Sequence, residues 1–325
     1  MIIRLIQTQI HKMTVLWVLS LLSVFSLLLF SLPALAAENG WQRGSCLTGS
    51  GVYRWEGGDR YEGQCQNNYF EGRGSLTLSN GDRYEGQFSA DQKHGQGIYY
   101  FFTGDRYEGQ FLNGRQNGQG TLYLVSGERY SGQYLNDRRH GRGVFNFING
   151  DSYDGQWLDD RIDGQGTYNF VNGDRYSGQW RDGVQDGRGS FSWANGDHYE
   201  GMFSNNLRDG QGTFNWNNKN RYTGGWREGQ QDGYGTKVWA SGDRYQGQWR
   251  QNVMSGQGTY SFANGNRFEG SFQDNKIHGE GTYYFANGDR YMGTWMDGER
   301  HGPGVYYDTL GKSETMNFLV GRRVT

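Results

Sequence analysis

The sequence predicts an all-β protein, an elongated single-layer antiparallel meander with two strands in each 23-residue repeat. An aromatic residue recurs at an unbroken spacing of 23 residues, and Gly follows it two positions later. Within each repeat, apolar and polar residues alternate with period two, and Asn-Gly recurs between the alternating segments. The recurring aromatic residues are Tyr61, Tyr84, Tyr107, Tyr130, Tyr153, Tyr176, Tyr199, Tyr222, Tyr245, Phe268 and Tyr291.

Each repeat contains two segments with strand periodicity. Residues 105–111 place Tyr107, Gly109 and Phe111 on one face and polar residues on the other, which predicts a strand with one apolar face. Residues 281–285 alternate in the same way and predict the second strand. The Asn-Gly that follows the second strand is a strong hairpin signal, so each repeat is expected to be one β-hairpin step.

The glycines of the apolar face are expected to make room for rings. Without a side chain, positions such as Gly63, Gly72 and Gly74 let a large ring lie over the backbone. Ring-on-glycine contact would then stabilise a single layer along its length. With strands about 4.8 Å apart, eleven repeats would form a rod on the order of 100 Å long.

The first 36 residues resemble an export signal. Arg4 and Lys12 form a basic start, an apolar run over 15–30 follows, and Ala34-Leu35-Ala36 is a small-x-small cleavage pattern. The alternative is an uncleaved N-terminal anchor, because the charge-free segment 14–37 is long enough to span a bilayer. In either case we expect the repeats to lie outside the cytoplasm, in the periplasm, the cell envelope or the extracellular space.

The rest of the chain divides into an array and its ends. We expect an N-terminal cap half-repeat over 37–58, eleven repeats over 59–311 and a degenerate C-terminal cap over 312–325. Cys46 and Cys65 both fall at the N-terminal edge of the array, and a cysteine pair in an exported protein indicates a disulfide. Closing a loop of this length contributes about 3 kcal/mol in the chain-entropy model, which would protect the first repeat from fraying.

Composition excludes several classes of partner. Without Arg4 and Lys12 the chain carries 30 basic and 34 acidic residues, a net charge of −4, so we expect no nucleic-acid partner and no polyanion. Membrane contact is expected only through the N-terminal segment, if that segment is not cleaved. The 52 aromatic residues stand in register with the 55 glycines, which indicates ordered repeats and not a flexible linker.

The repeat resembles the MORN repeat (membrane occupation and recognition nexus). The resemblance rests on Tyr-Glu-Gly-Gln-Phe at 84–88 and Gly-Gln-Gly-Ile-Tyr-Tyr-Phe at 95–101, and it extends over about 49–311. It implies an arched antiparallel meander that serves as a scaffold, dimerisation or partner-docking element, with lipid association proposed for some members. The chain departs from the pattern at Cys65, at Lys237 in a ring position, and at Lys219, which replaces the turn glycine and puts the geometry of that turn in doubt.

We find no catalytic constellation, and we predict a non-enzymatic protein with no cofactor and no metal. The kinase and methyltransferase modules that accompany MORN repeats in some relatives are not present in this sequence. Four histidines share one slot before the Gly-x-Gly pair, where equivalent positions lie about 10 Å apart, too far to share a metal ion. Arg and Glu two residues apart share a face and predict a ladder of surface ion pairs. The histidines are His94, His140, His278 and His301.

Two functions of different classes remain. In the first, the array is a scaffold in the cell envelope that docks a protein partner or forms a homodimer through an aromatic stripe that one sheet layer cannot wholly bury. In the second, the stripe stacks on an envelope glycan; membrane lipid is a third alternative, weakened by the net negative charge. The candidate binding stripe is Trp193, Trp216 and Trp239, with Trp157, Trp180, Trp226 and Trp249.

Overall fold

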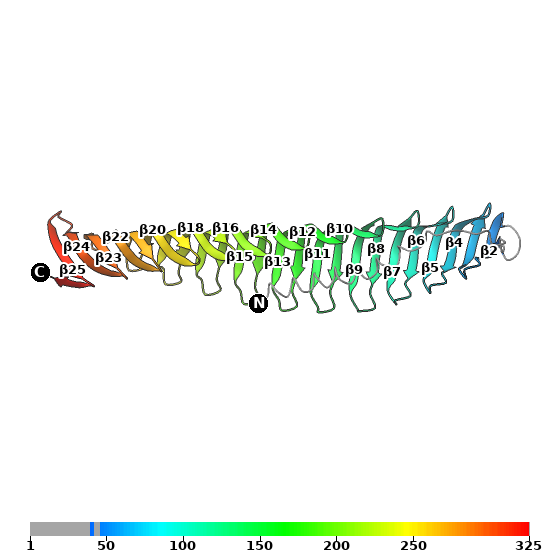
Figure 1. Cartoon of the computed structure of the whole chain (residues 1–325), viewed down its shortest axis with the longest axis horizontal. Helices are drawn as coiled ribbons and strands as arrows, with labels where there is room; N and C mark the ends of the chain where they lie inside the picture. The colour runs from blue at the N-terminus through cyan, green and yellow to red at the C-terminus, as the bar shows by residue number, and fades with distance from the viewer. Residues whose placement is uncertain (1–39, 42–45, 325) are drawn as a thin grey trace, which may run out of the picture. The chain divides into compact units, whose positions relative to one another are not determined.

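The computed structural model describes residues 40–41 and 46–324, and these form one open antiparallel sheet of 26 strands with no helix. Strands that are consecutive in sequence lie side by side, as Figure 1 shows. The predicted fold class, a meander of hairpin repeats, is confirmed. The predicted signal or anchor, residues 1–36, and the start of the predicted N-terminal cap lie outside the described residues.

The strands fall into two compact units. The first runs up to Val171 and includes Trp180–Gly183, and the second comprises Asn172–Gln179 and the chain from Val184 onward, so that β13 (Arg175–Arg181) is divided between them. The first unit contains β1 (Gly40–Trp41), β2 (Thr48–Arg54), β3 (Arg60–Gln66), β4 (Tyr69–Thr77), β5 (Arg83–Ser89), β6 (Gln92–Tyr100), β7 (Arg106–Leu112), β8 (Arg115–Tyr123), β9 (Arg129–Leu135), β10 (Arg138–Asn146), β11 (Ser152–Leu158) and β12 (Arg161–Asn169). The second contains β14 (Val184–Ser192), β15 (His198–Ser204), β16 (Leu207–Asn215), β17 (Arg221–Arg227), β18 (Gln230–Val238), β19 (Arg244–Arg250), β20 (Val253–Ser261), β21 (Arg267–Gln273), β22 (Lys276–Tyr284), β23 (Arg290–Met296), β24 (Glu299–Tyr307), β25 (Ser313–Leu319) and β26 (Arg322–Val324).

Two kinds of connection alternate along the chain. Between β9 and β10 only Asn136 and Asp137 intervene, both with positive φ (50° and 69°), as a type I′ turn requires. Between β10 and β11 the loop spans 147–151 and contains the Asn-Gly, of which only Gly150 has positive φ (90°). Asn-Gly therefore marks a hairpin as predicted, but through a five-residue loop, and the two-residue turns lie at the opposite edge of the sheet.

The loop with Lys219 keeps the geometry of its neighbours, contrary to the doubt raised by the sequence. The N–H of Lys219 donates to the carbonyl of Trp216 at 3.0 Å, and the N–H of Trp216 donates to that of Asn220 at 2.9 Å. Lys219 adopts φ of 70°, where the other repeats place Gly. A left-handed conformation costs a residue with a Cβ about 1–2 kcal/mol, so this loop is strained and not redirected.

Rings lying on glycine pairs form the core. Tyr153 is fully buried, and its ring covers Gly155 of its own strand and Gly166 of the next. A Cβ on Gly166 would lie 2.5 Å from carbons of this ring, closer than any real contact. The Tyr153 hydroxyl donates to the carbonyl of Gln156 at 3.0 Å. The predicted ring-on-glycine contact is therefore present, with one ring serving two glycines.

A β-bulge explains how a single layer encloses these rings completely. In the β11–β12 pair the register shifts between Gly155 and Trp157, and such a bulge bends the strand. The Tyr153 ring then lies edge-on to Trp157, at 5.5 Å between centroids, and edge-on to Trp180 of the next repeat, at 5.6 Å. Trp157 and Trp180, two members of the predicted binding stripe, are therefore buried, because the bent strand closes around this row of rings.

A glutamine braces each bulge in much of the array, a role that the sequence analysis missed. The Oε1 of Gln156 accepts the N–H of Gln165 at 2.6 Å, across the position where Gly164 has φ of 98°. The same contact recurs from Gln87 to the N–H of Gln96 and from Gln110 to the N–H of Gln119, both at 2.7 Å. The glutamine therefore supplies the acceptor that the interrupted ladder cannot.

The N-terminal end is covered by a ring and a disulfide. Trp41 lies over Gly51 of β2 and packs edge-on to Tyr53 at 5.5 Å. A disulfide joins Cys46 to Cys65, as predicted, with 6.0 Å between the Cα atoms. At the other end β25 pairs with β24 in the same register as the full repeats, although Glu314 and Met316 occupy its Tyr and Gly slots.

If ring-on-glycine packing holds the sheet together, Gly166→Val should lower the free energy of unfolding by about 3 kcal/mol or more, because the new side chain must displace the Tyr153 ring or the strand. Gln165→Val, one position away on the exposed face, should stay within about 0.5 kcal/mol of the parent. Urea denaturation of the two variants measures the difference, and equal losses would refute the packing account.

Lys219→Gly should raise the free energy of unfolding by about 0.5–1 kcal/mol, because relief of the left-handed strain exceeds the entropy that glycine adds to the unfolded chain. Lys219→Ala is the control and should give no gain, since alanine has the same Cβ. Thermal melts compare the three proteins; a gain in the alanine variant would show that the side chain and not the backbone is responsible.

Candidate functional site

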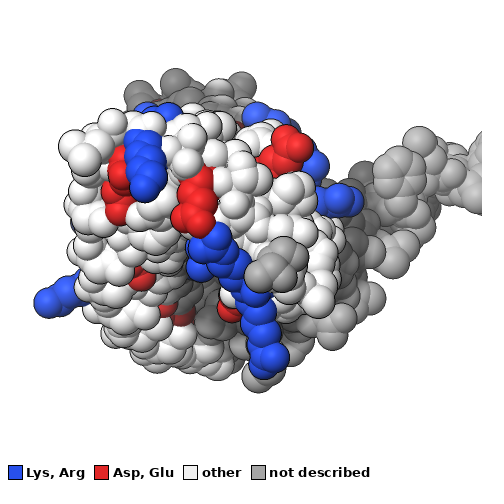
Figure 2. All heavy atoms as spheres, turned by 90° about the vertical axis from the view of Figure 1, so that its left-hand side faces the viewer, with Lys and Arg blue, Asp and Glu red and all other residues white. Residues whose placement is uncertain are grey.

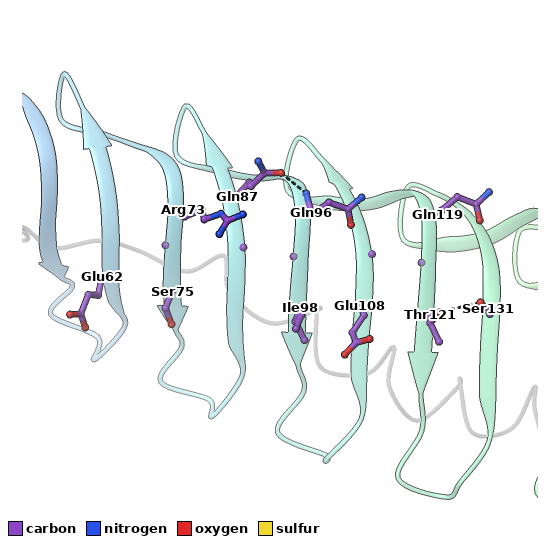
Figure 3. A pocket seen from close by; sticks show the side chains of 15 residues that line it. Glu62, Arg73, Ser75, Gln87, Gln96, Ile98, Glu108, Gln119, Thr121 and Ser131 are labelled. Carbon is purple, nitrogen blue, oxygen red and sulfur yellow. Dashed lines mark hydrogen bonds between the residues drawn. The ribbon is translucent and has the colours of Figure 1, made fainter.

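A groove of about 1050 Å³ lies on the polar face of the first unit, across β3 to β9. Figure 3 shows Arg73, Gln87, Gln96 and Gln119 along one side of it. The other side carries hydroxyl, carboxylate and apolar side chains, and glycine backbone lies between the two rows. The second row comprises Glu62, Ser75, Ile98, Glu108, Thr121 and Ser131.

Arginines neutralise the carboxylates of the groove. Arg106 pairs with Glu108 at 3.1 Å, and Arg60 pairs with Glu62. The Arg106 guanidinium also lies 4.6 Å from the ring centroid of Tyr123. The predicted Arg–Glu ladder is thus present here, and it recurs at Arg83–Glu85 and Arg267–Glu269. Each exposed pair contributes about 0–1 kcal/mol to the free energy of unfolding. Its main effect is to hold the Arg and Glu side chains beside one another.

The last residue of each five-residue loop, Asp in most repeats, has a role that the sequence analysis did not identify. Asp151 is buried, and its Oδ1 accepts the N–H of Val171 in the next five-residue loop at 2.8 Å. Its Oδ2 accepts from the Tyr168 hydroxyl and from Asn149 Nδ2, both at 2.8 Å. Asn220 and Asn266 make the same bond to the next loop. These contacts form rungs that join successive loops along the long-loop edge.

The rungs also explain several shifted ionisations. Hydrogen bonds from the Ala263 N–H and the Ser241 hydroxyl lower the pKa of Asp243. Burial, with the charge and hydrogen bond of Asp243, raises the pKa of Tyr260 to about 12. Both groups therefore keep one protonation state near neutral pH and act as fixed structural partners.

Large apolar side chains stand out of the five-residue loops of the first unit. Phe102, Val125, Ile148 and Val171 are 71%, 72%, 66% and 69% exposed, and they occupy the same slot in four successive repeats. We call them the apolar loop row. In the second unit this slot carries Ala194, Asn217, Ala240, Ala263, Ala286 and Thr309. The apolar loop row is therefore a local feature of the first unit.

Comparison with known families identifies the repeat. The sequence profile of the MORN repeat matches a short segment at 47–60 and then eleven consecutive segments, from 61–83 to 291–309. The chain belongs to the MORN repeat family. MORN arrays are a non-catalytic repeat fold, and no other domain is found in the sequence. A search of curated proteins finds no match.

Several solved structures are similar to this MORN array at low sequence identity. The TCP domain of Drosophila melanogaster SAS-4, in complex with a proline-rich motif of Ana2, is 15% identical over 53% of this chain and 99% of its own, with a TM-score of 0.31. The TCP10 domain of Danio rerio CPAP is 13% identical over 75% and 99%, with a TM-score of 0.32. A streptogramin B lyase is 11% identical over 85% and 84%, with a TM-score of 0.15. Similarity at this level carries no argument about this chain.

The seven tryptophans of the predicted stripe do not share one surface of the MORN array. Four are buried, and their indole N–H groups donate to glycine carbonyls of the preceding repeat, as Trp157 does to Gly143 at 3.2 Å. Trp193, Trp216 and Trp239 are half-buried, and Trp216 packs on Phe214 with 4.5 Å between centroids. The buried four are Trp157, Trp180, Trp226 and Trp249.

Lys237, the departure from the MORN ring pattern, lies among these tryptophans. Its Nζ is 5.2 Å from the ring centroid of Trp216, 5.3 Å from that of Trp239 and 5.8 Å from that of Trp249. Burial lowers the pKa of Lys237. In this repeat the Lys237 ammonium group therefore makes cation–π contacts with the tryptophans, where other repeats have an aromatic ring that packs against its neighbours.

The histidine slot supplies acceptors to the neighbouring MORN repeat. His278 Nδ1 accepts the N–H of Asp297 at 3.5 Å, and His301 Nδ1 accepts that of Val320 at 3.4 Å. In another repeat the carboxylate of Glu71 accepts the N–H of Ala90 at 2.7 Å from the same slot. Among residues 40–41 and 46–324, no group of three or more His, Cys, Asp or Glu is placed to hold a metal ion.

The remaining surface features give no single-sign patch on the face that Figure 2 shows. Basic and acidic side chains lie beside one another there, at the end of the sheet where Figure 1 labels β25. Within the part of the chain that the structure describes, no helix has the length and apolar character to cross a bilayer.

Asp151→Ala should lower the free energy of unfolding by about 1–3 kcal/mol, because the Val171 N–H and the Tyr168 hydroxyl lose a buried acceptor. Asp151→Asn is the matched control and should retain most of the stability, since Asn220 and Asn266 already serve in this slot. Urea denaturation distinguishes them; an asparagine variant as unstable as the alanine variant would contradict the rung.

Proposed function

We propose that this chain is a non-enzymatic MORN scaffold of the cell envelope that binds a protein partner or a second copy of itself through the apolar loop row. The row carries the proposal, because large apolar side chains exposed together on one edge of a protein mark interaction sites. Its four members are about two-thirds or more exposed and recur in four successive loops.

The rungs hold the backbone of the apolar loop row in place before a partner binds. The N–H of Phe102 is held by Asp82 at 2.8 Å, and that of Val125 is held by Asp105 at 2.8 Å. Backbone positions that are already fixed lose little conformational entropy when a partner docks. Successive members lie about 10 Å apart, two strand spacings, which gives a partner a regular series of anchor points.

Export to the envelope belongs to the same proposal. Its support is the signal-like segment 1–36 together with the Cys46–Cys65 disulfide, because disulfides persist in oxidising compartments. Lipid association has weaker support, since the chain without its first 36 residues has a net charge of −4.

Replacing Phe102, Val125, Ile148 and Val171 with Ser should abolish association while leaving the fold intact, because these side chains are exposed. Light scattering after size exclusion measures self-association, and a photo-cross-linker placed at Val125 in intact cells traps a protein partner. Replacing Ala240, Ala263 and Ala286 with Ser, and placing the cross-linker at Ala263, provide the control in the equivalent slot.

The proposal expects either a mass above one chain that the Ser variant loses, or an adduct at Val125 that is missing at Ala263. A monomer with no adduct at Val125 would overturn it.

A further inference from the structure

We propose that the groove on the polar face of the first unit binds an extended neutral polysaccharide strand, lying across β3 to β9. This site lies on the sheet face, whereas the apolar loop row lies at the long-loop edge. The proposal goes beyond the scaffold function and does not rest on it. The groove does not include the tryptophans of the predicted binding stripe, four of which are buried.

A row of amides lines one side of the groove. Gln occupies the equivalent position in five consecutive strands, β5 to β9. The Oε1 of Gln87 is fixed by the N–H of Gln96, which leaves its Nε2 as a positioned double donor. The exposed side chains of Gln96 and Gln119 make no hydrogen bond to other described residues. Gln87, Gln96 and Gln119 line the groove, and Gln110 and Gln133 occupy the equivalent positions of β7 and β9.

The opposite side of the groove offers hydroxyls and balanced charge. Ser75 and Thr121 present hydroxyl groups there, and Ile98 adds an apolar surface. Glu62 and Glu108 are neutralised by Arg60 and Arg106. Amides, hydroxyls and paired charges complement a neutral polyol.

The spacing of the rows favours a sugar chain over a polypeptide. Neighbouring strands lie about 4.7–4.9 Å apart, and one pyranose unit of an extended β-1,4-linked chain advances by a similar distance. A polypeptide in extended form advances by about 3.2–3.4 Å per residue, which does not match the amide row. A peptide crossing the strands also cannot add to the sheet by strand pairing, because the strands are already paired on both sides.

The second unit supplies an internal comparison, because its amide row is interrupted. The equivalent positions there include Gln211 and Gln257, but other residue types intervene between the glutamines. Gly225 and Tyr234 lie between Gln211 and Gln248, and Ser271 and Glu280 follow Gln257. A ligand that spans more than two consecutive amides should therefore bind the first unit alone.

Isothermal titration of the full chain with chitohexaose and with cellohexaose, both neutral β-1,4-linked hexamers, tests the proposal. We expect binding by at least one hexamer that weakens steeply as the oligomer is shortened to a disaccharide, because each unit occupies its own step of the row. Gln96→Ala combined with Gln119→Ala should weaken binding by about tenfold or more, the loss expected when hydrogen bonds to a neutral ligand are removed.

Gln211→Ala combined with Gln257→Ala is the matched control and should leave the affinity unchanged. Thermal melts of both double variants check that the exposed substitutions preserve the fold. No binding of either hexamer, equal losses in the two double variants, or binding only of an acidic oligosaccharide or a proline-rich peptide would overturn the proposal. None of these outcomes affects the apolar loop row, whose test uses different residues and a different readout.

Discussion

The structure depends on one contact, a tyrosine ring lying over two glycines in neighbouring strands. Tyr153 covers Gly155 and Gly166, and no residue with a Cβ fits at either glycine without moving the ring or the backbone. The contact joins adjacent strands, and the edge-on rings on either side join adjacent repeats. A single layer can therefore hold a core without a second sheet, provided that ring and glycines recur in register.

Other features follow from enclosing that ring. The bulge bends the strand around it, the bulge interrupts the hydrogen-bond ladder, and Gln156 restores the missing acceptor. At the long-loop edge Asp151 ties each loop to the next. With the core and the edges fixed in this way, the polar face and the loop tips are free to vary, and the groove and the apolar loop row occupy those two surfaces.

The sequence alone predicted the period, the two strands per repeat, the ring-on-glycine contact and the cysteine pair, because each is a regular pattern of residue types. It did not predict the bulge, since Gly155-Gln156-Trp157 reads as unbroken alternation and the extra residue is visible only in the pairing. Because the bulge was not foreseen, the sequence analysis placed Trp157 in an exposed binding stripe, whereas Trp157 is buried. The bond from Asp151 to Val171 was missed because its partner lies in the next repeat, and the sequence analysis considered only the ion pairs between Arg and the Glu two residues later.

Nuclear magnetic resonance of the glycine Hα protons tests the central claim most directly, in protein labelled selectively at glycine. A proton beneath an aromatic ring is shielded by the ring current, so the account predicts a set of Hα resonances shifted well upfield, including those of Gly155 and Gly166, which move when Tyr153 is replaced by Leu. Glycine Hα shifts within the ordinary range of β-strands, unaffected by that replacement, would contradict it.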